Sequence, residues 1–284
     1  MIEKYNSIAL KTLGPKSAKL IMQLYDEGKS LFTTEDAAKI AGLSGNTLNV
    51  LLCRLVKKGI ITRLKSGLFN IVPFELGSET VYISDPQVIA GNILYKKGLS
   101  ESDYYISHGS AFELHQMVTQ PQLTVSCSVV NSVRKENIHG IEIHFHPLKR
   151  EQFFGVQKMW IGKDKTIQVS DLERTIIDGL KKPYYCGGII EVAKGLWIKK
   201  DKIDFKKLIN YALMLDSGAV IRRLGFLLDL FKIGKEEERE LLLKKLTNTY
   251  VLLDPDFVHE GKYLSKWKLR LNVDSLEILN AVRS

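Results

Sequence analysis

The sequence predicts an α+β protein, in which an N-terminal winged helix-turn-helix is followed by a larger α+β domain with a mixed sheet and a helical C-terminal lobe. Three observations support this fold class. Residues 31–72 follow the order helix, tight turn, helix, β-hairpin. Residues 81–160 mix short strands with helices, and the pattern after Ile167 is mostly helical. The expected domains span 1–75 and 81–284, with a candidate division of the second into 81–165 and 166–284.

The predicted helix-turn-helix contains residues that are typical of the starts and ends of two short helices. Thr33 is able to cap the first helix, Asp36 follows three residues later, and Gly42 ends the helix. Ser44, another good N-cap, begins the second helix, and Gly59 ends it. Five apolar residues of the second helix have helical spacing, and we expect them to pack inward. They are Leu48, Leu51, Leu52, Leu55 and Val56.

Two further elements complete the predicted module. The runs 60–64 and 68–72 flank Lys65-Ser66-Gly67 and indicate a β-hairpin, which forms the wing. An amphipathic helix at 15–27 is expected to pack under the other two helices. Its side chains available for burial are Ala18, Ile21, Met22, Leu24 and Tyr25.

Beyond a connector at 73–80, the pattern predicts helices and strands in mixed order. The expected helices are 87–95, 110–117, 171–180, 188–196, 205–215, 219–231 and 236–246. The expected strands are 104–107, 123–130, 141–145 and 157–161, with a late pair at 250–253 and 267–273.

Because the apolar residues of the second helix pack inward, its opposite face points outward. A helix of this size fits a DNA major groove. Asn46 and Asn49 can pair with base edges, because an amide both donates and accepts hydrogen bonds. Gly45 lets a backbone approach closely, and Val50 and Cys53 share the outward face. Cationic side chains further along the helix and on the wing suit phosphate oxygens. The predicted DNA-binding residues are Ser44, Gly45, Asn46, Asn49, Arg54, Lys57, Lys58, Arg63, Lys65 and Ser66.

Positive charge is concentrated in the first quarter of the chain. The formal net charge is +9, and residues 1–73 hold eleven Lys or Arg against five Asp or Glu, which leaves +6 there. A basic domain favours contact with phosphates, and its affinity for DNA should fall steeply with salt. Two other interpretations stay open: the solvated face of an ordinary helical hairpin, and a winged helix that docks a protein.

The composition is that of a soluble globular protein, with 45% hydrophobic and 26% charged residues. No apolar run reaches membrane-spanning length, and the first residues lack the apolar core of a signal peptide. Cys53, Cys127 and Cys186 have no paired spacing, so they indicate neither a disulfide framework nor a zinc site. We therefore expect a cytoplasmic protein without membrane contact.

Two histidines on one face of a predicted strand are candidate metal ligands. His144 and His146 share that face with Glu142, while Ile143 and Phe145 alternate onto the other. No third ligand follows from the spacing, and a solvated polar strand face explains the same alternation.

One predicted helix start is dense in polar groups. Asp171, Glu173 and Asp178 suggest metal-dependent phosphoester chemistry. A structural interpretation is stronger, because Ser170 and Glu173 fit a capping box. Arg174 and Asp178 can also pair at i, i+4.

Gly187 and Gly188 precede a predicted helix and can cradle an anion, but a loop that ends at a helix start is the favoured interpretation. Cys186 lies near no base in the sequence, so a nucleophilic role is unsupported. The sequence holds no phosphate-binding loop, GxGxxG, HExxH or GxSxG motif. We therefore expect no catalytic residue, no metal and no cofactor, and not an enzyme.

Four blocks of the chain stand in a recognisable order: YYISHGSAFELHQM at 104–117, IHGIEIHFHPL at 138–148, FFGVQKMWIGKDKTIQVSDLERTIIDGL at 153–180 and YYCGGIIEVAKGL at 184–196. Together they resemble the AbiEi-type antitoxins, which are also described as transcriptional regulators of viral defence systems. VSDLERTIID and YYCGG are specific as a pair. The resemblance covers roughly residues 5–200, with an echo in WKLRLNV at 267–273.

The resemblance implies an N-terminal winged helix that binds operator DNA. It also implies a C-terminal domain that counteracts a nucleotidyltransferase-like toxin encoded beside it and that supports cooperative binding at repeated operator sites. Such pairs form type IV toxin–antitoxin systems, in which the antitoxin acts without a stable complex with the toxin. Two copies on adjacent repeats would add affinity through effective concentration.

The leading hypothesis is a cytoplasmic, sequence-specific repressor that binds double-stranded DNA at repeats in its own promoter and is the antitoxin of a type IV pair. The alternative is a stand-alone transcriptional regulator whose C-terminal domain senses a ligand or a protein partner. A third hypothesis is a metal-dependent enzyme that works at His144, His146 or the cluster from Asp171 to Asp178.

Overall fold

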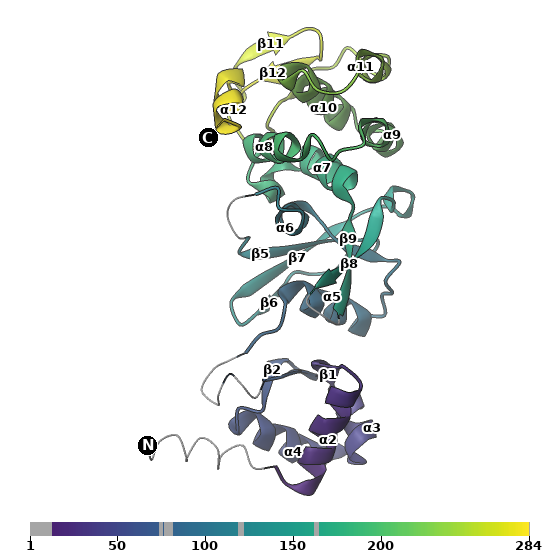
Figure 1. Cartoon of the computed structure of the whole chain (residues 1–284), viewed down its shortest axis with the longest axis vertical. Helices are drawn as coiled ribbons and strands as arrows, with labels where there is room; N and C mark the ends of the chain where they lie inside the picture. Colours follow the sequence, from purple (N-terminus) through teal and green to yellow (C-terminus); the bar gives the residue numbers. More distant parts are fainter. Residues whose placement is uncertain (1–12, 74–75, 77–81, 119–121, 162–164, 284) are drawn as a thin grey trace. The chain divides into compact units, whose positions relative to one another are not determined.

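The computed structural model of the chain describes residues 13–73, 76, 82–118, 122–161 and 165–283. Contacts divide the chain into two units, which are described separately (Figure 1). The first unit extends to Lys97 and includes the short segments 137–141 and 160–165, and the second holds the remainder. Most of the predicted connector lies outside the described residues, so the predicted domain bounds stay a prediction.

The first unit contains the winged helix-turn-helix that the sequence predicts. Its helices are α2 (Pro15–Asp26), α3 (Thr34–Ala41) and α4 (Gly45–Lys57). Its strands are β1 (Leu31–Thr33), β2 (Ile61–Lys65) and β3 (Leu68–Ile71), in the antiparallel order β1-β3-β2. The predicted hairpin is β2 and β3. β1 was not expected, because three residues are too few to show a strand period.

Local capping explains where α3 begins and ends. The side-chain Oγ1 of Thr33 accepts a hydrogen bond from the backbone N–H of Asp36 at 3.1 Å. The carboxylate of Asp36 accepts one from the backbone N–H of Thr33 at 2.8 Å. This capping box satisfies two backbone donors that the first helical turn leaves unpaired. Gly42 ends the helix in the left-handed conformation, as the sequence predicts.

The core of this module is the predicted leucine stripe with its partners. α4 buries Leu48, Leu52 and Leu55, and Leu51 and Val56 pack against the same cluster. Removing such side chains from water is the main favourable term in folding a small domain.

One prediction for α2 is wrong in part. Ile21 and Leu24 are buried, but Met22 and Tyr25 are exposed, and Leu20 is buried instead. The buried face of α2 therefore lies closer to Leu20 than the sequence pattern indicated. A further helix, α5 (Pro86–Lys96), also belongs to the first unit.

The second unit holds most of a mixed sheet with the strand order β6-β7-β5-β4-β9-β8, and the strand residues 137–138, 141, 160–161 and 165 are assigned to the first unit. β4 is antiparallel to β5 and parallel to β9, and β5 is parallel to β7. β6 and β9 were not among the predicted strands. The bounds are β4 (Tyr104–Ile106), β5 (Thr124–Val129), β6 (Glu136–Ile138), β7 (Ile141–Pro147), β8 (Val156–Ile161) and β9 (Lys165–Ser170).

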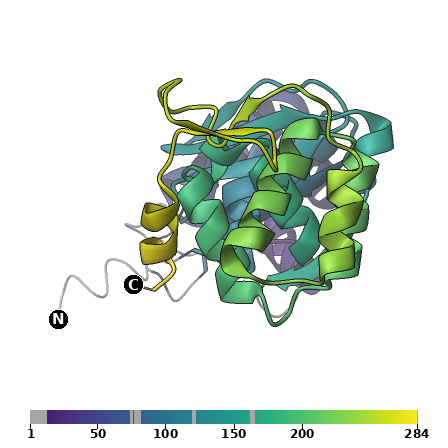
Figure 2. The ribbon, with the colours of Figure 1, turned by 90° about the horizontal axis from the view of Figure 1, so that it is seen from above.

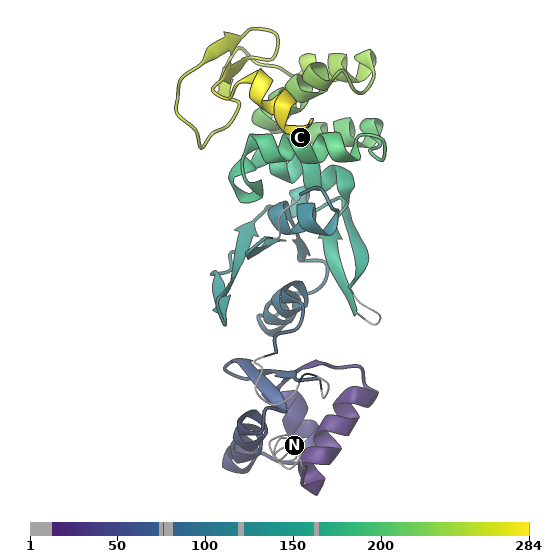
Figure 3. The ribbon, with the colours of Figure 1, turned by 60° about the vertical axis from the view of Figure 1, so that its left-hand side comes forward.

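Helix α6 (His108–Leu114) contacts both strand β5 and helix α7, so it lies between the sheet and the helical lobe (Figure 3). The helices of the lobe pack side by side (Figure 2). They are α7 (Leu172–Lys181), α8 (Ile189–Lys199), α9 (Phe205–Leu215), α10 (Gly218–Phe231), α11 (Glu236–Leu243) and α12 (Ser275–Ala281), with the short 3-10 helix η3 (Pro183–Cys186).

A small sheet completes the lobe. β10 (Val251–Leu252) pairs in parallel with β12 (Leu269–Leu271), which confirms the predicted late strand pair, and β11 (Lys262–Leu264) was not predicted. Trp267, two residues before β12, is buried. Its indole N–H donates a hydrogen bond to the carboxylate of Asp229 at 2.7 Å. The ring lies against Gly225 of α10 so closely that no side chain fits there. The α+β class with a mixed sheet and a helical lobe is thus confirmed.

Candidate nucleic-acid interface

The outward face of α4 carries small and polar side chains. Asn46 and Asn49 are both exposed, as are Val50 and Cys53 on the same helix. The burial of the leucine stripe orients the helix, because residues three and four positions apart share one face. An amide on this face is free to pair with the edge of a base, and it can donate and accept at once.

The first turn of α4 leaves its backbone N–H groups open to an anion. Ser44 occupies the N-cap position as predicted, but its side chain makes no capping hydrogen bond, so that part of the expectation is wrong. No acidic residue lies in the first turn, whereas Arg54 and Lys57 lie in the last. An uncapped helix N-terminus with its positive dipole end is a suitable place for a DNA phosphate.

Gly45 begins α4 with a φ of +56°, a conformation that side chains other than glycine adopt at a cost. A Cβ built at this position would meet nothing within 4 Å. The space before the helix is therefore open, which agrees with the predicted close approach of a backbone.

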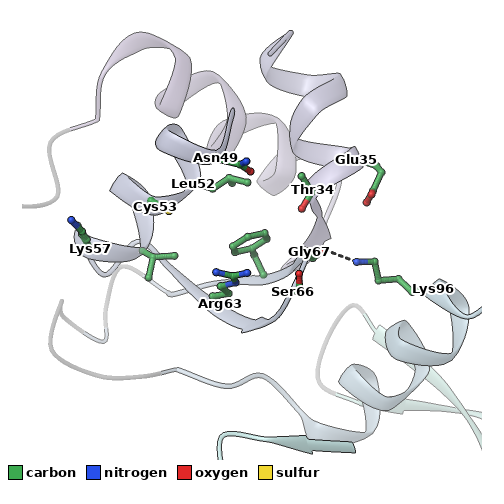
Figure 4. Close-up of a pocket in the computed structure, with 12 residues that line it drawn as sticks. Thr34, Glu35, Asn49, Leu52, Cys53, Lys57, Arg63, Ser66, Gly67 and Lys96 are labelled. Carbon is green, nitrogen blue, oxygen red and sulfur yellow. Dashed lines mark hydrogen bonds between the residues drawn. The ribbon is translucent and has the colours of Figure 1, made fainter. Parts of the chain in front are cut away.

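A groove of about 740 Å³ runs between the front of α4 and the wing (Figure 4). Asn49, Lys57, Arg63 and Ser66 are predicted DNA-binding residues that all line it. Its apolar wall is formed by Leu52, Val56 and Phe69, and Thr34, Glu35, Cys53, Gly67 and Lys96 complete the lining. The structure thus brings one base-reading candidate together with two cations and the tip of the wing.

Other predicted residues lie apart from the groove. Arg54 and Lys58 line a separate hollow beside the start of α2, together with Leu13 and Pro15. Ser44, Gly45 and Asn46 stand at the beginning of α4, and Lys65 ends β2. The predicted phosphate contacts therefore fall on two sides of the helix, as expected for a helix with a DNA strand on either side of it. Their role in DNA binding stays a prediction.

Two charged residues of the groove were missed by sequence reasoning. Lys96, near the end of α5, donates to the carbonyl oxygen of Gly67 at 2.7 Å and so holds the tip of the wing. Glu35 adds a negative charge, and hydrogen bonds from its own backbone N–H and from Thr33 lower the pKa of its carboxyl. Lys96 lies outside residues 31–72 and Glu35 lies on α3, so no signal within residues 44–66 could have found them.

The candidate metal ligands on β7, His144 and His146, contact other side chains of the protein. His144 shares a hydrogen bond of 2.9 Å with Glu142. His146 is not part of a solvated face, contrary to the favoured interpretation: its ring packs against Tyr185 and His108, with centroids 4.1 and 4.6 Å away. Among the described residues, no group of three or more His, Cys, Asp or Glu is placed to hold a metal ion.

The acidic residues at the start of α7 hold the fold together. Asp171, not Ser170, is the N-cap, and its carboxylate accepts from the backbone N–H of Arg174 at 2.8 Å, so the predicted Ser170–Glu173 capping box is wrong. Lys207 of α9 pairs with Asp171 at 3.1 Å and with Glu173 at 2.8 Å. The predicted pair of Arg174 with Asp178 is confirmed, with an N–O distance of 2.9 Å at a fully buried position.

An anion does lie at the start of α8, but it is a side chain of the protein and the glycines donate nothing to it in the structure. The carboxylate of Asp254 accepts a hydrogen bond from the backbone N–H of Ile189 at 2.8 Å, and it lies beside Gly188. The adjacent Cys186 is buried, and burial raises the pKa of its thiol, so it is a poor nucleophile.

The fold and this face define a protein of the winged-helix class, with a second unit attached. A family model described as "Transcriptional regulator, AbiEi antitoxin" matches residues 19–72, so that segment is similar to the domain of this family. The match confirms the predicted resemblance over the helix-turn-helix and the wing. The description of the family names regulators and antitoxins.

The crystal structure of the RV2827C protein from Mycobacterium tuberculosis is similar to the whole chain. The TM-score is 0.71 at 13% sequence identity, and the alignment covers 96% of each chain. At this identity the likeness establishes the fold alone. None of the curated proteins matches the sequence. Within the described residues, no helix is both long and apolar enough to cross a bilayer.

Proposed function

We propose that the protein is a sequence-specific DNA-binding repressor that regulates its own operon at promoter repeats. The observation that carries this proposal is the exposed front of α4, where Asn46 lies in the first turn after an uncapped N-cap. Asn49 lines a groove together with Lys57 and Arg63. Amides supply base readout, and cations and backbone N–H groups supply the contacts to phosphates.

Direct binding tests the regulatory half of this proposal. Fluorescence anisotropy with labelled duplexes from the gene's own upstream region, at about 0.15 M salt, should show a preference of at least ~10³ over scrambled duplexes of the same length. Equal affinity for both duplexes would reject sequence-specific binding. The test should use the full chain, because one module alone binds weakly and a second copy on an adjacent repeat adds affinity.

We further propose that the protein is the antitoxin of a type IV pair, which opposes a nucleotidyltransferase-like toxin without a stable complex. Support comes from the AbiEi match at residues 19–72 and from the sequence blocks between 104 and 196. Co-expression with the nucleotidyltransferase encoded next to the gene, where one is present, should restore growth. A variant that carries Asn46→Ala and Asn49→Ala should protect as well as the wild type when both genes are expressed from foreign promoters. If neither the wild type nor the variant relieves the toxicity, the antitoxin function is rejected and only the regulatory function stands.

A second candidate function is a stand-alone regulator whose second unit senses a ligand. A polar cavity in that unit favours it, lined by His108, His146 and Lys181 among others. The same co-expression experiment separates the two functions, because a pure regulator does not relieve toxicity. A cytoplasmic location agrees with both candidates.

A further inference from the structure

The second unit contains a cavity of about 270 Å³ whose walls are polar. Its lining residues come from β4, α6, β5, β7, α7 and η3, so six elements of the sheet and lobe converge on it. The volume is at the small end of ligand sites, which usually begin near ~300 Å³. The cavity therefore suits a small metabolite. It is lined by Tyr105, His108, Ser128, His146, Pro147, Leu148, Arg174, Asp178, Lys181, Lys182 and Tyr185.

One buried ion pair lines the cavity and carries no net charge. The guanidinium of Arg174 bonds to Asp178 at 2.9 Å, to the hydroxyl oxygen of Tyr105 at 2.8 Å and to the carbonyl oxygen of Gln152 at 2.8 Å. The hydroxyl of Tyr105 in turn donates to Asp178 at 3.0 Å. These groups are occupied with one another, so the charge that the cavity offers to a ligand comes from elsewhere.

Two neighbouring lysines supply that charge. Lys181 is half-buried, and its ammonium donates to the side-chain oxygen of Gln152 at 3.2 Å. Lys182 follows at the exposed end of α7. In the part of the chain that the structure describes, neither lysine forms an ion pair. Burial lowers the pKa of Lys181. A half-buried ammonium without a carboxylate costs free energy, and an incoming anion would remove that cost.

Two neutral imidazoles also line the cavity. Burial lowers the pKa of both His108 and His146 to about 3, and the nearby lysines and Arg174 contribute to the shift at His108. His108 Nδ1 shares a hydrogen bond of 2.8 Å with the hydroxyl of Ser107. His146 Nε2 is buried and has no hydrogen-bond partner within the described residues. A buried polar atom that lacks a partner is uncommon and asks for an explanation.

The backbone at His108 is also unusual. Its φ is +49°, in the left-handed region that residues other than glycine seldom adopt. Such conformations are strained and concentrate at binding sites, where the surrounding structure maintains them. The side chain is nearly inaccessible and packs edge-on against Tyr185 at 5.4 Å. The backbone strain thus coincides with a residue that lines the cavity.

From these observations we infer that the cavity binds the phosphate group of a small phosphate monoester, with Lys181 and Lys182 as its cationic ligands. A phosphate monoester carries a charge near −2 at neutral pH, which matches the two unpaired ammonium groups, whereas a carboxylate carries only −1. Lysine is a common phosphate ligand. The aromatic ring of Tyr185 offers a wall for the organic part of the molecule. The inference does not depend on DNA binding by the first unit.

Isothermal titration of the full-length protein tests this inference with three probes: inorganic phosphate, glycerol 3-phosphate and adenosine 5′-monophosphate. We expect one equivalent of at least one monoester to bind saturably, and more tightly than inorganic phosphate. The two monoesters separate a small polar organic group from a nucleoside. Absence of saturable binding of both monoesters at about 10 mM, or inorganic phosphate binding as tightly as either, would overturn the inference.

Variants locate the site. The double variant Lys181→Ala, Lys182→Ala should weaken monoester binding at least tenfold, because it removes both charge-assisted contacts. A matched control is Lys244→Ala, Lys245→Ala, which alters an adjacent exposed lysine pair in the same unit. The exposed single variant Lys182→Glu keeps the test decisive if the double variant fails to fold, and it should also weaken binding at least tenfold. Unchanged binding in Lys182→Glu, or an equal loss in the control pair, would contradict the assignment.

Discussion

The candidate DNA interface of the first unit and the polar cavity of the second are built in opposite ways. On α4 the functional candidates are exposed and bonded to little, and the apolar residues behind them provide the stability. Around the cavity the polar residues are themselves the interior: Tyr105, Arg174 and Asp178 are all buried and bonded to one another. Exposed groups can change with little cost to folding, whereas buried polar groups cannot.

Breaking the buried pair should have the largest effect. Arg174→Ala leaves the Asp178 carboxylate in the interior without a cation, and we expect a loss of about 3–5 kcal/mol in the free energy of unfolding. Urea denaturation followed by circular dichroism measures this loss. Lys158→Ala, which removes an ion pair with Glu101 whose side chains are both about 60% exposed, is the control and should have no measurable effect. Similar small losses of unfolding free energy in Arg174→Ala and Lys158→Ala would show that the buried pair is no more important for stability than the exposed pair.

Acid should destabilise the second unit through its neutral imidazoles. The pKa of His108 is lowered to about 3 in the folded protein from a reference value of 6.5, so below about pH 6.5 the unfolded chain binds a proton that the folded chain does not. Stability therefore rises with pH in this range and is lost as pH falls, by about 2 kcal/mol between pH 6.5 and 5 for this one group.

Denaturant titrations at several pH values measure the acid effect. His108→Asn should reduce the slope of stability against pH by about one proton, and asparagine tolerates the left-handed backbone at this position. His259→Asn, at an exposed site, should leave the slope unchanged. An unaltered slope in His108→Asn would show that this imidazole does not stay neutral in the folded state.

Loss of the α3 cap should cost about 1 kcal/mol and should be confined to the first unit. Thr33→Ala removes the oxygen that accepts from the Asp36 backbone N–H. Hydrogen exchange should become faster at the amides of residues 34–41 and should stay the same at residues 172–243. Thr47→Ala on the exposed surface of α4 is the control. Faster exchange throughout the chain would mean that the two units do not respond separately.

The smallest effect is expected for a single phosphate contact. Lys57→Ala should weaken binding to all DNA sequences alike and should reduce the slope of log affinity against log salt by about 0.9. Lys19→Ala removes an exposed lysine of α2 that lies outside the groove, and it should leave both quantities unchanged. A loss restricted to the preferred sequence would instead place Lys57 against a base.

The same contrast explains what the sequence could predict. The cap at Thr33, the stop at Gly42 and the leucine stripe of α4 depend on residues a few positions apart, so local patterns were sufficient. The cavity joins Tyr105, His146 and Lys181, which are far apart in the chain and meet only through the sheet order and α7. No spacing rule reveals such a site. For the same reason Lys96 was missed, because its contact with Gly67 joins α5 to the wing.

Two local predictions were wrong for related reasons. The cap of α7 falls on Asp171 and not on Ser170, because the Ser170 hydroxyl bonds with Thr175 at 2.7 Å inside the fold. His146 leaves the expected solvated face because η3 brings Tyr185 against it. In both places a tertiary contact replaced the local preference, which is the usual way in which sequence patterns mislead.

If the front of α4 reads base edges, a substitution on that face should change which base is preferred. Selection of bound sequences from a randomised duplex pool should be compared between the wild type and Asn49→Arg. Asparagine pairs best with adenine and arginine with guanine in the major groove, so the account predicts a change from adenine to guanine at one position of the site, with the other positions retained. An identical preference in both proteins, or no preference in the wild type, would contradict the account.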